Sequence, residues 1–406
     1  MRIAFLVQRA NFYRLYAPIV DEALRQGWDV ECWHDYSQAR HGQKGYNFPA
    51  VESAPRFVGG TPRFRTYQGV PDLRVLQHSA DAVVSLSPRP FEPDASRSSV
   101  TWLMLQHALS NFTGYGPDGF RKSDLVGLYS EHWAQLALEF FREKELVRPG
   151  DGTEQQIDTK ARAVGFPEME AASLVDPREV RRRLGIPADQ PVVVMLPYSY
   201  GFGPSSFRTT HRGQQWSRWG LARSLARQVW SDLKVVKAVR AFASRNGAHL
   251  VVKARMKRRP PFYTRAAGDT HLYDESVYPA TILELLKIAS VCVGFYSTTV
   301  HEAAYLGIPY VCLRPSDRDV RGPRAVQRVF MDRSKSSWDF PGVSTVLEVS
   351  EAIASLPRSA LDDFKVDAQA RAAYVEKFLG YDDGRSSKRV LDELRREQSQ
   401  KKGEVR

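Results

Sequence analysis

A histidine follows one of the apolar runs of this 406-residue chain, at Gln106-His107. The run before it, residues 100–105, indicates a buried strand, and open α/β sheets bind ligands at the carboxyl ends of their strands. A histidine with an unperturbed pKa of about 6.5 suits proton transfer near neutrality. His107 is therefore our candidate catalytic residue, a general base for an acceptor hydroxyl. The alternative is an ordinary histidine bonded to a neighbouring carbonyl.

A second polar segment follows the apolar run 249–253 and carries positive charge. Lys253 and Arg255 lie two residues apart, so their side chains point the same way if the strand continues. Together the two cations can hold one anionic group. The alternative is an exposed basic turn.

A third polar segment, Ser297-Thr298-Thr299, lies between the apolar run 291–294 and a helical pattern. The free N–H groups and the positive end of a helix, together with three hydroxyl groups, make a phosphate-binding turn. The alternative is helix capping, because Thr299 and Glu302 have the S/T-x-x-E spacing of a capping box. Capping uses a single threonine, however, and leaves Ser297 and Thr298 unexplained.

Strand and helix patterns alternate along the chain and position these three segments. Apolar runs predict strands near residues 2–7, 28–33, 82–86, 100–105, 125–129, 192–196, 249–253, 291–294 and 310–313. Helical patterns cover about residues 18–26, 131–144, 176–184, 281–289 and 299–306. Two terminal helices are predicted at about residues 360–379 and 387–397, with the last ten residues as a tail. This alternation predicts an α/β fold with parallel sheets, in two halves. We divide the chain into an N-terminal domain, 1–167, a C-terminal domain, 168–358, and terminal helices with a mobile tail, 359–406.

The positive charge of the chain is concentrated in one segment. The 58 Lys and Arg residues outnumber the 46 Asp and Glu residues, which gives a net charge of +12. Residues 201–265 hold fifteen of the basic residues and one acidic residue, Asp232. Within this segment, residues 216–240 set tryptophans and cations beside an apolar stripe, which is typical of a helix in a membrane interface. An anionic membrane surface is a candidate partner; the alternative is packing of the tryptophans against residues 201–215.

The composition also bears on cofactors and compartment. The 3 cysteines all lie in apolar runs, which disfavours disulfides and thiolate metal sites and fits a reducing cytoplasm. No pair of histidines at metal-ligand spacing occurs, and we expect no metal and no other cofactor. No apolar run approaches the roughly 20 residues of a membrane span, and residues 2–7 are too short for a signal peptide. We expect a cytoplasmic protein, or one peripheral on the inner face of the membrane.

A set of short motifs occurs in a fixed order between about residues 100 and 315. They are Gln106-His107, Val164-Gly165-Phe166-Pro167, Arg183-Leu184-Gly185-Ile186-Pro187, Pro197, and Glu302-Ala303 with Leu306-Gly307 and Pro309. In this order they resemble the GT-B glycosyltransferases, in detail the CDP-glycerol glycerophosphotransferase and UDP-N-acetylglucosamine 2-epimerase neighbourhood. The chain departs from the family's His-Gly, K-x-H-P and D-Y-S-S motifs at Ala108, Arg255-Met256 and Phe295.

The resemblance implies two Rossmann-like doubly wound domains that face each other across a cleft, the GT-B fold. It implies that the first domain binds the acceptor and the second the nucleotide of an activated donor. His107 would deprotonate the acceptor. The donor phosphates would be bound by Lys253, Arg255 and the turn Ser297-Thr298-Thr299, and the ribose hydroxyls by Glu302. The predicted function is a metal-independent glycosyltransferase that uses a nucleotide-activated donor and a saccharide or lipid-linked acceptor to build a cell-surface glycan or glycolipid.

Other functions remain open at this point. Within the same neighbourhood they are a CDP-glycerol-type polyol-phosphate transferase and a UDP-N-acetylglucosamine 2-epimerase-like enzyme, although epimerisation calls for carboxylates where this turn has hydroxyls. Non-catalytic alternatives are a degenerate GT-B scaffold and a nucleotide- or nucleic-acid-binding protein. The chain has no helix-turn-helix, zinc-finger or RNP signature, so we expect no specific binding of nucleic acid.

Overall fold

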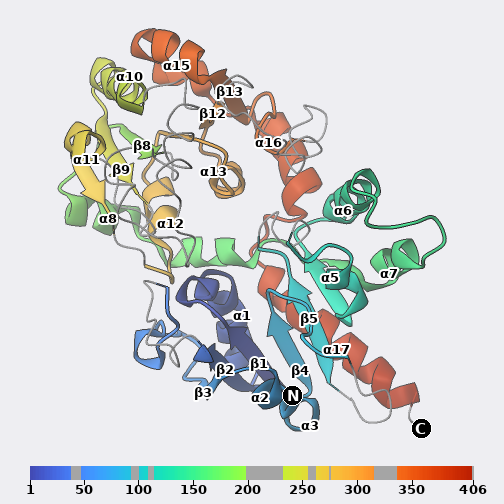
Figure 1. Cartoon of the computed structure of the whole chain (residues 1–406). Helices are drawn as coiled ribbons and strands as arrows, with labels where there is room; N and C mark the ends of the chain where they lie inside the picture. The colour runs from blue at the N-terminus through green and yellow to red at the C-terminus, as the bar shows by residue number, and fades with distance from the viewer. Residues whose placement is uncertain are drawn as a thin grey trace, which may run out of the picture. The chain divides into compact units, whose positions relative to one another are not determined.

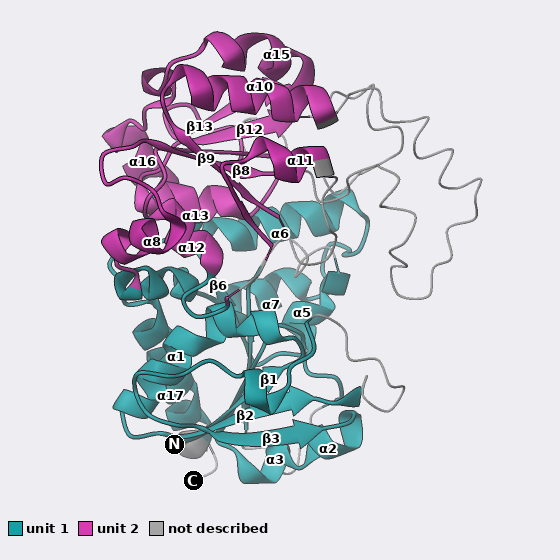
Figure 2. Ribbon diagram, turned by 90° about the vertical axis from the view of Figure 1, so that its left-hand side faces the viewer, with its two compact units in different colours: residues 1–174, 277–280, 375–406 teal, residues 175–276, 281–374 magenta. Residues whose placement is uncertain are grey.

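The structure is a computed structural model that describes residues 1–37, 47–92, 100–107, 114–197, 232–254, 262–273, 276–314 and 336–404. The chain forms two compact units (Figure 2). Unit 1 comprises residues 1–174, 277–280 and 375–406, and unit 2 comprises residues 175–276 and 281–374. Each unit is built around its own parallel sheet, which confirms the predicted pair of Rossmann-like α/β units.

The sheet of unit 1 has seven strands in the order β3-β2-β1-β4-β5-β6-β7 (Figure 1). The strands are β1 (Arg2–Val7), β2 (Asp29–Asp35), β3 (Arg63–Tyr67), β4 (Ala82–Ser85), β5 (Thr101–Leu105), β6 (Leu125–Leu128) and β7 (Ala161–Ala163). Every residue of β4, β5 and β6 is buried. Strands buried on both faces require continuous apolar runs, which is why the sequence pattern located them.

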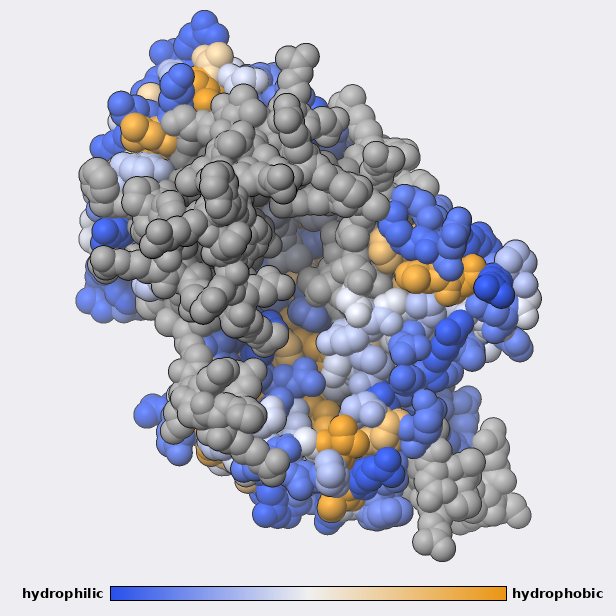
Figure 3. All heavy atoms as spheres, in the orientation of Figure 1, coloured by the Kyte–Doolittle hydropathy of each residue, from blue (hydrophilic) through white to orange (hydrophobic). Residues whose placement is uncertain are grey.

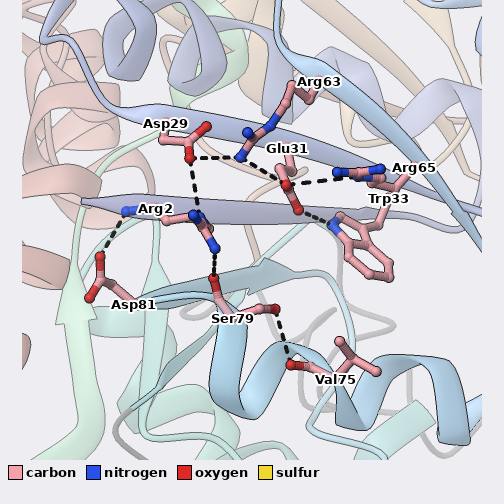
Figure 4. A network of polar contacts seen from close by, with 9 residues as sticks. All are labelled: Arg2, Asp29, Glu31, Trp33, Arg63, Arg65, Val75, Ser79 and Asp81. Carbon is pink, nitrogen blue, oxygen red and sulfur yellow. Dashed lines mark hydrogen bonds and ion pairs between the residues drawn. The ribbon is translucent and has the colours of Figure 1, made fainter.

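Strand β3 at the edge of this sheet was not predicted. Its residues are mostly exposed, and ion pairs hold it to the neighbouring strand (Figure 4). The Arg63 guanidinium lies 2.6 Å from the Asp29 carboxylate and 3.0 Å from that of Glu31. Glu31 also accepts a hydrogen bond from Trp33 Nε1 at 2.7 Å, and Arg2 Nε donates to Asp29 at 3.1 Å. An edge strand stabilised by charge has no apolar run for a sequence pattern to detect.

The helices of unit 1 are α1 (Tyr13–Arg25), α2 (Val70–Arg74), α3 (Leu76–Ser79), α5 (Asp118–Arg121), α6 (His132–Glu143), α7 (Thr153–Lys160) and α17 (Ser386–Glu404). Helix α1 begins at Tyr13 rather than at the predicted Pro18, because a 3₁₀ turn, Ala10–Phe12, leads directly into it. Pro18 therefore lies inside the helix, on a face that the core buries completely at Tyr16 and Ile19.

Helix α17 extends beyond the end that the sequence predicted for it. The pattern ended the helix near Glu397 and left the last ten residues as a tail, but the helix continues to Glu404. Gln398 is buried and donates to Thr101 Oγ1 at 3.0 Å, and Lys401 Nζ donates to the Val100 carbonyl at 3.2 Å. These bonds to the start of β5 hold the last turns of the helix against the sheet.

The sheet of unit 2 has six strands in the order β10-β9-β8-β11-β12-β13. They are β8 (Val192–Leu196), β9 (His249–Lys253), β10 (Thr270–Leu272), β11 (Val291–Gly294), β12 (Tyr310–Arg314) and β13 (Ser344–Glu348). The helices are α8 (Pro177–Leu184), α10 (Asp232–Arg245), α11 (Phe262–Ala267), α12 (Thr281–Leu286), α13 (Thr299–Leu306), α15 (Val349–Ser355) and α16 (Ala368–Tyr374). The outer strands β10 and β13 were not predicted, because they are only partly buried.

The register of this sheet aligns the ends of its central strands. Gly294 of β11 pairs with Leu196 of β8, and Val252 of β9 pairs with Met195, which sets Lys253 level with Leu196. Strands lie about 4.8 Å apart, so Lys253 and Gly294 are separated by roughly 10 Å across β8. Lys253 and the turn after Gly294 therefore lie at the same carboxyl edge of the sheet.

No helix in the described part of the chain combines the length and the apolar character needed to cross a membrane. Figure 3 shows one face of the molecule, in the orientation of Figure 1. Over the described part of this face, hydrophilic side chains cover much of the surface and apolar side chains lie in small groups.

Candidate nucleotide site and candidate catalytic histidine

The turn between β11 and α13 carries three of the predicted phosphate ligands. Strand β11 ends at Gly294 and helix α13 begins at Thr299. The N-cap residue is Thr298, and its side chain makes no capping hydrogen bond. A capping box would require Thr299 itself at the N-cap, so the capping interpretation of Thr299 and Glu302 is wrong.

The three hydroxyl groups of this turn have different surroundings. Ser297 Oγ and Thr299 Oγ1 lie 3.1 Å apart, and the Thr299 N–H donates to Ser297 Oγ at 3.3 Å. Thr299 is buried, whereas Thr298 is half-buried. Among the described residues the Thr298 hydroxyl has no hydrogen-bond partner. Thr298 therefore offers a hydroxyl to a ligand, while Ser297 and Thr299 shape the turn.

Gly294 allows a close approach beneath this turn. A Cβ atom at Gly294 would lie 2.7 Å from the Tyr310 hydroxyl and 3.0 Å from Leu196 Cβ. Without that atom, the Tyr310 hydroxyl reaches the Phe295 carbonyl and donates to it at 2.6 Å. Glycine at the end of β11 thus lets the neighbouring strand bind the first carbonyl of the turn.

Lys253 lies at the end of β9, on the same edge of the sheet as the turn. Its side chain is only 6% exposed, and Nζ donates to the Ala254 carbonyl at 2.9 Å. An ammonium group donates charge-assisted hydrogen bonds, so an anion at this edge of the sheet would gain a strong partner in Lys253. Arg255, the second predicted cation, lies outside the described residues, and its role stays a prediction.

Glu302 lies in the first turn of α13 and is only 2% exposed. Burial, together with the nearby charge of Glu302, raises the pKa of the Cys292 thiol on β11. The carboxylate thus lies beneath the surface, between the helix and the sheet. Its assignment as a ribose ligand stays a prediction.

In unit 1, His107 follows β5 at the carboxyl edge of the sheet. The preceding Gln106 is 1% exposed; its N–H donates to the Gly127 carbonyl at 2.8 Å and its side-chain oxygen accepts from the Tyr129 N–H at 3.0 Å. These bonds tie the end of β5 to β6. The His107 ring is half-buried, with its centroid 5.6 Å from that of Phe12 in the loop after β1. The structure thus places His107 where the sequence predicted it.

Two other histidines are sequestered in the core. Burial lowers the pKa of His34 to about 4 and that of His301 to about 3. Each meets a tyrosine hydroxyl, Tyr13 at 2.5 Å from His34 Nε2 and Tyr374 at 3.1 Å from His301 Nδ1. Both are neutral at physiological pH and inaccessible, so their roles are structural. His107 differs from them, because its side chain is only half-buried, although its Nδ1 atom is enclosed.

Two hydrogen bonds to the turn were not foreseen from the sequence. Trp338 Nε1 donates to the Ser297 carbonyl at 2.9 Å, from a residue 41 positions away. The Tyr310 hydroxyl binds the Phe295 carbonyl, as described above. Gly294 was the available signal for Tyr310, because a glycine that ends a buried strand indicates a close approach. No local pattern points to Trp338.

The remaining predictions concern metals and membranes. In the described ranges, no group of three or more His, Cys, Asp or Glu side chains is placed to hold a metal ion. Of the predicted membrane stripe, residues 216–231 lie outside the described part of the chain. Helix α10 carries the rest, with Lys234 and Lys237 exposed and Val236 buried in the core.

Comparisons with known proteins identify the fold. No family model and no curated protein matches the chain. The structure of the wall teichoic acid polymerase TagF matches with a TM-score of 0.58 at 12% identity, over 98% of this chain and 89% of that chain. A putative UDP-N-acetylglucosamine 2-epimerase from Listeria monocytogenes matches with a TM-score of 0.54 at 13% identity, over 96% and 94%. The UDP-GlcNAc 2-epimerase from Neisseria meningitidis matches with a TM-score of 0.52 at 11% identity, over 98% and 100%. The GT-B neighbourhood predicted from the motifs is thus confirmed at the level of fold.

Proposed function

We propose that the chain is a transferase that uses a nucleotide-activated donor, of the metal-independent glycosyltransferase type, and builds a cell-surface glycan or glycolipid. The observation that carries the proposal is the turn before α13. It follows a buried parallel strand, opens an eight-residue helix and presents the Thr298 hydroxyl without a partner among the described residues. Helix N-termini at the carboxyl edge of a sheet are suited to bind phosphate.

Unit 2 binds the donor in this proposal. The leaving nucleotide phosphate gains negative charge as its bond to the transferred group breaks. The positive end of α13, the Thr298 hydroxyl and the Lys253 ammonium stabilise that charge in place. Arg255 adds a second cation and Glu302 accepts hydrogen bonds from ribose hydroxyls.

Unit 1 binds a saccharide or lipid-linked acceptor and supplies the base. The acceptor oxygen attacks the activated carbon of the donor, and His107 takes the proton from that oxygen. The half-buried position of His107 keeps it accessible, and the bonds of Gln106 hold its backbone in place. General-base catalysis of this kind contributes about 10²- to 10⁴-fold in rate.

A second candidate is transfer of a polyol phosphate, with attack on phosphorus instead of carbon. It is favoured by the similarity to TagF, a variant of which was solved with CDPG. Epimerisation is the third candidate, favoured by the similarity to the UDP-GlcNAc 2-epimerase from Neisseria meningitidis, which was solved with UDP-GlcNAc. Incubation of a nucleotide sugar without an acceptor distinguishes epimerisation from the two transfer reactions, because only an epimerase converts the sugar under these conditions.

The test is a thermal-shift panel of CDP, CMP, UDP, GDP and ADP. A ligand that binds only the folded state raises the melting temperature, and 100-fold excess over Kd stabilises by about 2.7 kcal/mol. We expect one nucleoside diphosphate to stabilise the chain more than its monophosphate. If none of the five shifts the melting temperature, the chain is not a nucleotide-dependent enzyme, and a scaffold or nucleic-acid-binding role takes precedence.

Membrane association is a separate part of the proposal. Residues 216–240 are proposed to bind anionic lipid through their cations, in a salt-sensitive way. Changing Arg223, Arg227 and Lys234 together to Glu should abolish sedimentation with anionic liposomes. Unaltered sedimentation of this triple variant would remove the membrane from the proposed partners.

A further inference from the structure

Two buried aromatic side chains hold the phosphate-binding turn from the side of the protein interior. The Tyr310 hydroxyl donates to the Phe295 carbonyl at 2.6 Å, and Trp338 Nε1 donates to the Ser297 carbonyl at 2.9 Å. Tyr310 is 1% exposed and Trp338 is 8% exposed. These two carbonyls of the turn are therefore bonded to the protein itself.

Trp338 is in turn fixed by its own neighbours. Its N–H donates to Ser336 Oγ at 3.1 Å, and its carbonyl accepts from Ser344 Oγ at 2.7 Å, at the first residue of β13. Its ring meets that of Tyr296 edge-on, with centroids 5.2 Å apart. Trp338 is thus anchored in the sheet and contacts the turn through both its ring and its N–H.

A second link joins the same segment to α13. The Tyr374 hydroxyl donates to the Ser337 carbonyl at 2.9 Å and lies 3.1 Å from His301 Nδ1, in the first turn of the helix. At the other end of α13, Arg371 Nε donates to the Ala304 carbonyl at 3.0 Å. Both ends of the helix are therefore held, so that its positive end keeps a fixed direction.

The bond from Trp338 orients one N–H group in particular. In a planar trans peptide unit the C=O and the following N–H point in opposite directions. The Ser297 carbonyl points at Trp338, so the Thr298 N–H of the same peptide unit points away from it. The Thr298 hydroxyl belongs to the same residue and has no partner among the described residues. The Val300 N–H also donates to the Ser297 carbonyl, at 3.3 Å, so the shorter bond from Trp338 and the first turn of the helix together direct the N–H of Thr298 away from the interior.

We propose that Trp338 is a positioning residue for donor phosphate: its hydrogen bond to the Ser297 carbonyl presents the Thr298 N–H to the anion. This inference rests on the proposed nucleotide site in unit 2. The residue acts through the turn and does not touch the substrate. Its removal should therefore weaken phosphate binding without affecting contacts to the nucleoside.

The test compares Trp338→Phe with Trp133→Phe. Trp133 in unit 1 is 2% exposed, and its Nε1 also donates to a backbone carbonyl, that of Phe378, at 2.7 Å. Each variant loses one hydrogen bond donated by a buried indole N–H and keeps an aromatic ring. The two variants should therefore lose similar amounts of unfolding free energy. Affinities for CDP, UDP, GDP and ADP, and for the four corresponding nucleosides, are measured by calorimetry well below the melting temperature of each variant.

We expect Trp338→Phe to bind the nucleoside diphosphate that the native chain prefers about five- to tenfold more weakly. Trp133→Phe should bind it like the native chain, and neither variant should differ in any nucleoside binding. Equal diphosphate affinity in the native chain and Trp338→Phe overturns the positioning role alone. A native chain that binds none of CDP, UDP, GDP and ADP overturns the proposed donor site and this role with it.

Should Trp338→Phe fail to fold, Ser344→Ala supplies the second variant. It releases the Trp338 carbonyl and leaves the aromatic core intact. A loss of diphosphate affinity with unchanged nucleoside binding supports the role. Unchanged affinity for the diphosphate contradicts it.

Discussion

The two units present their candidate residues at the same kind of place, the carboxyl edge of a parallel sheet, but support them differently. In unit 2 the turn before α13 is bonded by side chains from β12 and from the segment before β13. In unit 1 His107 is a single half-buried side chain that packs against Phe12. Binding a phosphate needs several fixed dipoles, whereas a base needs one accessible nitrogen with a suitable pKa. Changes to the buried groups that hold the turn in unit 2 should therefore alter binding and stability together, and changes at His107 should alter rate alone.

The largest expected effect is the loss of turnover in His107→Ala, a change in unit 1 that should leave the nucleotide site of unit 2 intact. Turnover should fall by about 10²- to 10⁴-fold, because the acceptor loses its base. Nucleotide affinity and melting temperature should stay as in the native chain. The control is His78→Ala, which removes an exposed histidine of α3 in the same unit. Unchanged turnover in His107→Ala would remove His107 from the mechanism.

The second prediction concerns the glycine beneath the turn. Gly294→Ala places a methyl group 2.7 Å from the Tyr310 hydroxyl, and we expect a cost of about 1–3 kcal/mol together with weaker nucleotide binding. Gly127→Ala in β6 meets the end of the flexible Leu105 side chain at 2.7 Å and should cost stability alone. Gly114→Ala, with no atom within 4 Å, is the neutral control. Chemical unfolding and CDP or UDP titration of all three variants measure both quantities. If Gly294→Ala bound nucleotide with the affinity of the native chain, the turn would not be part of the nucleotide site.

The third prediction distinguishes two adjacent threonines of the turn. Thr298→Ala should weaken nucleotide binding about tenfold, which corresponds to about 1.4 kcal/mol, and leave the melting temperature unchanged. Thr299→Ala removes a buried hydroxyl that bonds Ser297 and should lower the melting temperature as well. Calorimetry and thermal unfolding of each variant test this. If both variants lose only stability, the turn is a structural helix start.

The smallest expected effect is acid sensitivity, and it is shared by both units. The pKa of His34 in unit 1 is lowered to about 4 and that of His301 in unit 2 to about 3, in both cases chiefly by burial. In the unfolded chain each histidine has its ordinary pKa of about 6.5 and is protonated below that pH. The free energy of unfolding therefore falls as the pH drops from 6.5 towards the lowered pKa values of the folded state. Between pH 7 and 5.5 each histidine should cost about 1 kcal/mol of unfolding free energy. Denaturant unfolding of His34→Gln and His301→Gln at both pH values should show this dependence reduced in each variant. An undiminished pH dependence in both would show that other groups cause it.

The central strands and the helix α13 could be predicted because their causes are local. Strands buried on both faces have continuous apolar runs, and α13 ends at Gly307 in the left-handed conformation that favours glycine. The edge strand β3 could not be predicted, since ion pairs with β2 replace apolar burial. The continuation of α17 depends on Gln398 meeting Thr101 across the fold.

The residues of the candidate site also fall into those that local patterns predict and those that depend on packing across the fold. His107, Lys253 and Ser297 to Thr299 follow predicted strands, so their place at a sheet edge came from local patterns. Which hydroxyl of the turn makes no capping hydrogen bond could not be predicted in this way, because it depends on which residue begins α13. Trp338 reaches Ser297 only through the packing of β13 and the segment before it.

Hydrogen exchange with and without nucleoside diphosphate tests the central claim most directly. The account predicts that CDP or UDP slows exchange in peptides covering residues 295–302, and that the same ligand has no such effect in Thr298→Ala at a concentration that no longer saturates it. Binding of the nucleotide with protection confined to unit 1, and none in residues 295–302, would contradict it.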